Sequence, residues 1–129
     1  MTPSRSAFSY AVVRVVPDIE REEFVNAGLI LFDRERRFLA ARTHLDSAAL
    51  AALGADCDED GIRAQLELVE AIASGATRVA PFAAMTQTER FHWLTTPRST
   101  LVQSGPLHAG VTDDPAGTFE HLFEVMVAR

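Results

Sequence analysis

Two apolar segments near the start of the chain constrain its fold most strongly. Residues 8–16 (FSYAVVRVV) and 24–32 (FVNAGLILF) are rich in β-branched and aromatic side chains, which favour strands. The first segment is largely apolar on both faces and ends at Pro17, which predicts a central strand. A third strand is expected at 37–43, after the charged turn at 33–36. The short connections between these strands favour an antiparallel meander.

Helical patterns fill the middle and the end of the chain. Four helices are predicted, at residues 46–53, 62–73 and 86–93 and from Asp113 onward. One or two short extended segments, near 100–103 and 108–111, precede the last helix. This order of elements predicts an α+β fold, with helices packed on one side of an antiparallel sheet. The sheet would combine the three N-terminal strands with one or two later strands.

Length and composition predict one globular domain over residues 1–129, since the chain has 129 residues and is 47% hydrophobic. The single cysteine, Cys57, excludes an internal disulfide and favours a reducing compartment. The polar start lacks the apolar region of a signal peptide, and the apolar segments are too short to span a bilayer. We therefore expect a cytoplasmic protein.

The net charge of −6 is unevenly distributed, because residues 1–43 carry +1 and residues 44–129 carry −7. Every basic side chain is an arginine. An acidic chain repels phosphate backbones at long range, which disfavours nucleic acid as a partner. A local arginine face could still bind an anion.

The acidic segment 56–67 weakly matches a calcium-binding loop. Its oxygen-bearing positions would be Asp56, Asp58, Asp60 and Glu67. Gly54 would end the incoming helix early, and Arg63 replaces the usual aliphatic residue. The alternative is that these acids cap the N-terminus of the next helix. We therefore expect no metal and no other cofactor.

Arg14 is the most informative polar residue of the first strand. A guanidinium on an apolar strand face has to find a partner, because burying it alone is costly. If the first hairpin pairs residues whose numbers sum to about 40, Arg14 faces Asn26. The pair could form an anion or carboxylate site, or Arg14 could form an internal ion pair with Glu22 or Glu23. A register slip of one residue would separate Arg14 from Asn26.

No catalytic motif is evident. The four histidines lack the HxH and HExxH spacings of zinc sites. Cys57 lies between acids, which raise the pKa of a thiol and make it a poor nucleophile. A triad built on His108 and Asp113 lacks the G-x-S-x-G elbow that would support it. Whether the chain is an enzyme therefore stays open, and the pattern leans toward a non-enzymatic role.

Two parts of the chain carry a family resemblance. The first comprises YAVVRVVPD at 10–18 and REEFVNAG at 21–28, and the second contains FHWLTTPRST at 91–100. Together they resemble a bacterial domain-of-unknown-function family, numbered three thousand and thirty-seven, over nearly the whole chain. Proteins of this family often lie beside genes for kinases similar to the persistence-toxin type, so the resemblance implies a partner-binding or regulatory role, with a kinase as candidate partner. The polar residues carried over by position are Tyr10, Arg14, Glu23, Asn26, Arg98, Ser99, Gln103, His108 and Asp113.

Two functions follow from these observations. The favoured one is a non-enzymatic protein-interaction or regulatory module, and the alternative is a small enzyme or anionic-ligand-binding domain with an Arg/Asn/His cluster. The candidate ligand- or partner-binding residues are Tyr10, Arg14, Asn26, Arg42, Arg98, Ser99 and His108. Convergence of Arg14, Asn26, Arg98 and His108 in one pocket would favour the alternative, whereas dispersal or internal pairing would favour the interaction module.

Overall fold

The computed structural model describes residues 4–53, 56–98 and 100–128 of the chain. Its strands are β1 (Ser6–Asp18), β2 (Glu23–Asp33), β3 (Phe38–Thr43), β4 (Val102–Ser104) and β5 (His108–Thr112). Its α-helices are α1 (Ser47–Ala52), α2 (Glu59–Ser74), α3 (Gln87–Thr95) and α4 (Pro115–Met126). Short 3-10 helices occupy Ile19–Arg21 and Phe82–Ala84. The predicted α+β class and the order of its elements are confirmed.

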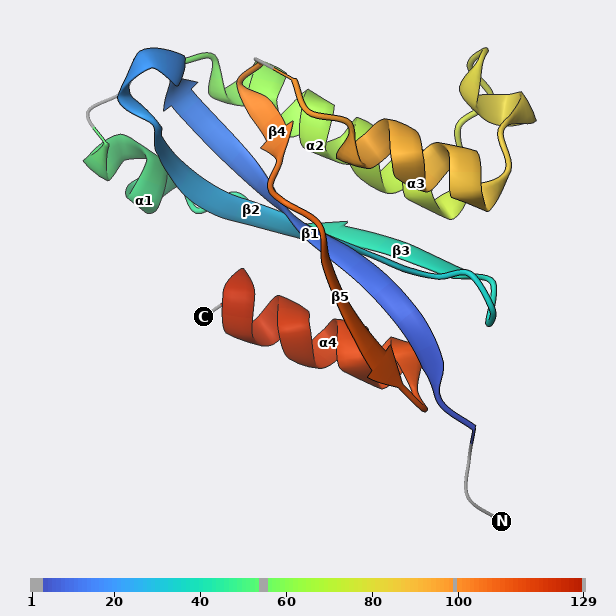
Figure 1. The fold of residues 1–129 in the computed structure, drawn as a ribbon. Coiled ribbons are helices and arrows are strands. Elements are labelled where there is room, and N and C mark those ends of the chain that lie inside the picture. Colours follow the sequence, from blue (N-terminus) through green and yellow to red (C-terminus); the bar gives the residue numbers. More distant parts are fainter. Residues whose placement is uncertain (1–3, 54–55, 99, 129) are drawn as a thin grey trace.

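The strands form one antiparallel sheet around β1 (Figure 1). β2 pairs with one edge of β1, and β3 follows β2. The other edge of β1 pairs with two strands in turn, with β5 along Ser6–Tyr10 and with β4 along Val13–Val15. The segment that contains β4 and β5 therefore forms the outer edge of the sheet opposite β3.

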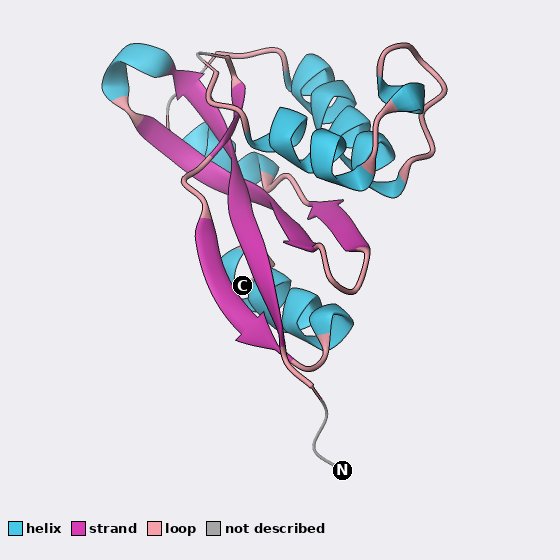
Figure 2. Ribbon diagram, turned by 45° about the vertical axis from the view of Figure 1, so that its right-hand side comes forward, coloured by secondary structure: helices cyan, strands magenta, loops and turns pink. Residues whose placement is uncertain are grey.

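Helices cover both faces of the sheet, so the prediction that they all pack on one side is wrong. Side chains such as Val13 and Ile30 pack with α1, α2 and α3, whereas the alternating residues Leu29 and Leu31 pack with α4. Figure 2 shows α4 well apart from α2 and α3. The physical reason lies in β2, which is buried at every position from Ala27 to Asp33. A strand with two apolar faces needs cover on both.

A β-bulge changes the pairing of β1 with β2. Val13 lies opposite Gly28, but the next residue, Arg14, lies opposite Asn26, so Ala27 is the extra residue. The predicted pairing of Arg14 with Asn26 is therefore confirmed, and the bulge is what produces it. The side chains of Asn26 and Arg14 lie on one face of the sheet. On the same face, α4 covers Leu29 and Leu31.

The helix starts follow local hydrogen-bonding rules. In α3, Thr86 accepts from the Glu89 amide and the Glu89 side chain accepts from the Thr86 amide, which confirms the predicted capping box. In α4, Asp114 is the N-cap and Pro115 the first helical residue, as expected from the sequence. Asp58 likewise caps α2 through the Gly61 amide.

Candidate interaction site

The predicted site residues do not converge in one place. Tyr10, Arg14 and Asn26 lie on the face of the sheet that α4 partly covers, and His108 pairs with Tyr10 there. Arg98 instead lies beside α3 and lines a cavity with Val13 and Ile30, on the opposite face. Ser99 lies outside the described residues. The four residues proposed for an anionic-ligand cluster are thus distributed over two faces.

The Arg14 guanidinium is held between an aromatic ring and the backbone. Its central carbon lies 4.1 Å from the centre of the Phe24 ring. On the other side, a Cβ added to Gly105 would lie 3.0 Å from Arg14 Nε and 3.1 Å from Cζ. Glycine at 105 therefore allows the guanidinium to lie against the chain. Arg14 Nε is buried without a hydrogen-bond partner within the described structure.

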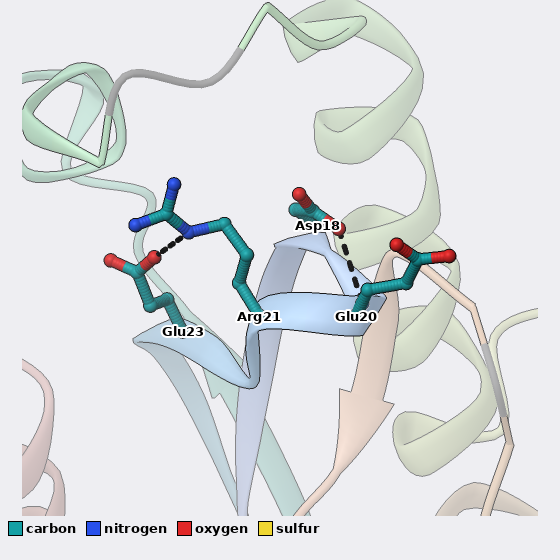
Figure 3. A network of polar contacts seen from close by, with 4 residues as sticks. All are labelled: Asp18, Glu20, Arg21 and Glu23. Atoms are coloured by element: carbon teal, nitrogen blue, oxygen red, sulfur yellow. Dashed lines mark hydrogen bonds and ion pairs between the residues drawn. The ribbon is translucent and has the colours of Figure 1, made fainter.

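The internal ion pair predicted as an alternative for Arg14 is not formed. Glu23 accepts from Arg21, as Figure 3 shows, while Asp18 caps the Glu20 amide. Across the described ranges 4–53, 56–98 and 100–128, no carboxylate pairs with Arg14. This half-buried arginine has an aromatic platform and no compensating acid.

Arg42, by contrast, pairs with a carboxylate of α4. Its Nη1 donates to Glu120 Oε2 at 2.7 Å, and its Nη2 donates to the other oxygen of the same carboxylate. The central carbon also lies 5.4 Å and 5.0 Å from the ring centres of Phe119 and Phe123. The hydrogen bond from Arg42 holds the pKa of the Glu120 carboxyl below its usual value, and the same bond raises the pKa of Arg42. The charge of Arg42 is therefore neutralised within the chain.

Arg98 caps the carboxyl end of α3. Its guanidinium stacks on Trp93 at 3.7 Å from the ring centre, and Nη2 donates to the Trp93 carbonyl at 2.7 Å. That carbonyl belongs to the last helical turn, where acceptors lack intrahelical donors. The adjoining cavity has about 150 Å³, which is below the roughly 300–1,000 Å³ of typical ligand pockets. The position of Arg98 is thus accounted for by helix capping.

The acidic segment does not form a calcium-type loop. α2 begins at Glu59, so Asp60 lies in the first helical turn and Glu67 two turns later. Asp58 acts as the N-cap, which is the capping role considered as the alternative. Within the described residues, no group of three or more potential ligands from His, Cys, Asp and Glu gathers around a common point.

Tyr10 and His108 form a cross-strand pair beside a shallow hollow. Their ring centres lie 5.2 Å apart. The adjacent hollow, of about 610 Å³, is lined by residues of β1, β5, α4 and the turn before α4. Its lining residues are Phe8, Tyr10, Ala109, Asp113, Asp114, Gly117, Thr118, His121 and Leu122. Of the β5 residues, Ala109 contributes to this lining.

β5 is an unprotected edge strand, a feature that sequence reasoning missed. It pairs only with β1 among the described strands. It contains no Asp, Glu, Lys or Arg, and Leu107 and Val111 are 55% and 64% exposed. The other edge strand, β3, carries Arg42 and packs against α2 and α4. The signal was the alternation of Leu107, Ala109 and Val111, because alternate strand residues share one face.

A family model described as a protein of unknown function, DUF3037, matches residues 10–127. No curated protein and no solved structure matches the chain. Among the described residues, no helix has the length and apolarity needed to cross a membrane.

Proposed function

The chain belongs to the DUF3037 family of proteins of unknown function, and we propose that it is a non-enzymatic protein-interaction module whose partner adds a strand to β5. The exposed, uncharged edge of β5 is the observation that carries this proposal. The resemblance described above makes a kinase the first candidate for the partner.

An edge strand offers a row of backbone donors and acceptors to a partner. Main-chain hydrogen bonds then provide affinity, and pockets for alternate side chains provide specificity. Along β5 the two faces differ. On one face, side chains of an added strand would reach the hollow beside Tyr10 and His121. On the other face they would meet Leu107 and Val111. Natural proteins commonly protect such edges with charges, and β5 has none.

The enzyme alternative requires Arg14, Asn26, Arg98 and His108 to act on one chemical group. Arg98 caps α3 on one face of the sheet, while Arg14 and His108 belong to the other. Their separation therefore supports the interaction module over a common catalytic site.

The test compares two exposed valines of equal accessibility. Val111 and Val79 are each 64% exposed, but Val79 lies in the loop before α3. The tagged protein and its Val111→Lys and Val79→Lys variants are incubated with lysate of the host, and bound proteins are identified by mass spectrometry. We expect a stoichiometric partner that Val79→Lys retains and Val111→Lys loses.

The purified complex then provides the structural readout. Strand addition should protect the amides of His108–Thr112 from hydrogen exchange. A partner that binds both lysine variants equally, or leaves these amides unprotected, would show that β5 is not the docking edge. If the unaltered protein retains no partner, the interaction proposal itself fails.

A further inference from the structure

The α4 face of the sheet carries two arginines in similar settings. Arg14 and Arg42 both lie over aromatic rings, Phe24 in one case and Phe119 and Phe123 in the other. Both project from strands of the same sheet toward the same side, as the pairing of the strands requires. Among the described residues, Arg42 alone of the two has a carboxylate partner, which α4 supplies as Glu120.

The binding end of Arg14 is available. Arg14 Nε is buried and has no hydrogen-bond partner within the described structure. In Arg42, Nη1 and Nη2 are the two atoms that donate to Glu120. In Arg14, the same two atoms make no hydrogen bond to described residues. The contacts with Phe24 and Gly105 fix the plane of the guanidinium and lower the entropy lost when it binds.

The end of α4 accounts for the absence of a described carboxylate at Arg14. α4 ends at Met126, whose carbonyl accepts from Asn26 Nδ2 at 3.2 Å. Asn26 lies opposite Arg14 on the neighbouring strand and contacts the carboxyl end of the helix, whereas Arg42 is beside the middle of the helix. The carbonyl groups at a helix end favour a guanidinium, and among the described residues no carboxylate pairs with Arg14 there.

We propose that Arg14, clamped between Phe24 and Gly105, binds the carboxylate of an aspartate or glutamate side chain of the partner. The Arg42–Glu120 pair is the internal template, with one carboxylate held end-on by Nη1 and Nη2. A single carboxylate suits this site better than a phosphate, because one arginine faces it and the chain as a whole carries −6. Assigning the carboxylate to a partner protein rests on the proposed function, whereas the carboxylate preference of the site does not.

The experiment titrates the protein with sodium propionate, the side-chain fragment of glutamate, and follows arginine Nε–Hε resonances by NMR. Sodium chloride at matched ionic strength and methyl phosphate are the comparison titrations. We expect a saturable shift at Arg14 with propionate, a weaker one with methyl phosphate, and none at Arg42. In Arg14→Lys, which keeps the charge but loses the fork, propionate perturbation of the Phe24 and Asn26 amides should need about tenfold more ligand.

Glu120→Ala is the matched positive control, because it removes the carboxylate that holds the Nη atoms of Arg42 and lies on an exposed position of α4. Arg42 should then respond to propionate as Arg14 does. If Arg42 responds in this variant while Arg14 stays unresponsive, or if chloride or methyl phosphate acts on Arg14 as strongly as propionate, the proposal is overturned. Neither result bears on the β5 edge, which the Val111→Lys comparison tests separately.

Discussion

The sheet face that α4 packs against has two halves: a covered half beside α4 and an open half beyond the end of this helix. Beside α4, Arg42 lies over Phe119 and Phe123 and is neutralised by Glu120. Beyond the end of α4, Arg14 lies over Phe24, which is 43% exposed, and no described carboxylate reaches it. The same residue type on the same face thus has an internal carboxylate in one half and, among the described residues, none in the other.

The two arginines show that residue type alone does not identify a candidate binding residue. What distinguishes Arg14 from Arg42 is the absence of a carboxylate partner among the described residues. Both arginines were candidates on sequence grounds, since both belong to apolar strands of the same sheet. α4 covers one and stops short of the other. The length and placement of one helix therefore separate an internal ion pair from a candidate carboxylate site.

The largest effect should come from removing the aromatic support in the covered half. Phe119 is 4% exposed and packs with Phe38 and Phe123. Phe119→Ala should lower the free energy of unfolding by about 3–5 kcal/mol, because it leaves a cavity between α4 and the sheet. Urea denaturation followed by circular dichroism would measure this change.

Phe24→Ala is the matched control in the open half. It should cost at most about 1 kcal/mol, since it removes an exposed cation–π contact and little buried area. Equal losses of unfolding free energy in Phe119→Ala and Phe24→Ala would contradict the difference between the covered and the open half.

An intermediate effect is expected at Gly105. A Cβ at this position would lie within 3.2 Å of the Val12 carbonyl oxygen as well as against Arg14. Gly105→Ala should therefore destabilise the chain by about 1–3 kcal/mol and displace the guanidinium from Phe24. In an Arg14→Ala background the same substitution should cost less, because one of the two obstacles is absent. Additive losses in the double variant would contradict the contact between Gly105 and Arg14.

The smallest effect concerns the pH dependence of the covered half. The Glu120 carboxyl has a lowered pKa because Arg42 donates to it. Its stabilisation is therefore present above the ordinary glutamate pKa, about 4.3, and is lost as the pH falls through the lower value of the folded chain. NMR titration should place the pKa of the Glu120 carboxyl below its usual range, and in Arg42→Gln this pKa should return to the usual range. If the pKa of Glu120 stays low in Arg42→Gln, the Arg42–Glu120 pair is not the cause of the shift.

Local patterns predicted the elements and part of the site. Thr86 and Glu89 start α3, and Asp114 with Pro115 starts α4, because caps and proline act within one turn of the chain. The pairing of Arg14 with Asn26 was predicted only on the condition of one register, and it occurs because the bulge at Ala27 shifts the register at this point. The carboxylate beside Arg42 was not predicted, because Glu120 is 78 residues away.

The sequence by itself determined where strands and helices form and which strand residues are apolar, because these depend on backbone preferences and short-range periodicity. Only the tertiary structure decided that Ala27 would bulge and that α4 would cover the second face. Since β2 is apolar on both faces from Ala27 onward, its pattern cannot say which helix packs on which side. That long-range choice gave Arg42 a carboxylate on α4, whereas no carboxylate of the described ranges pairs with Arg14.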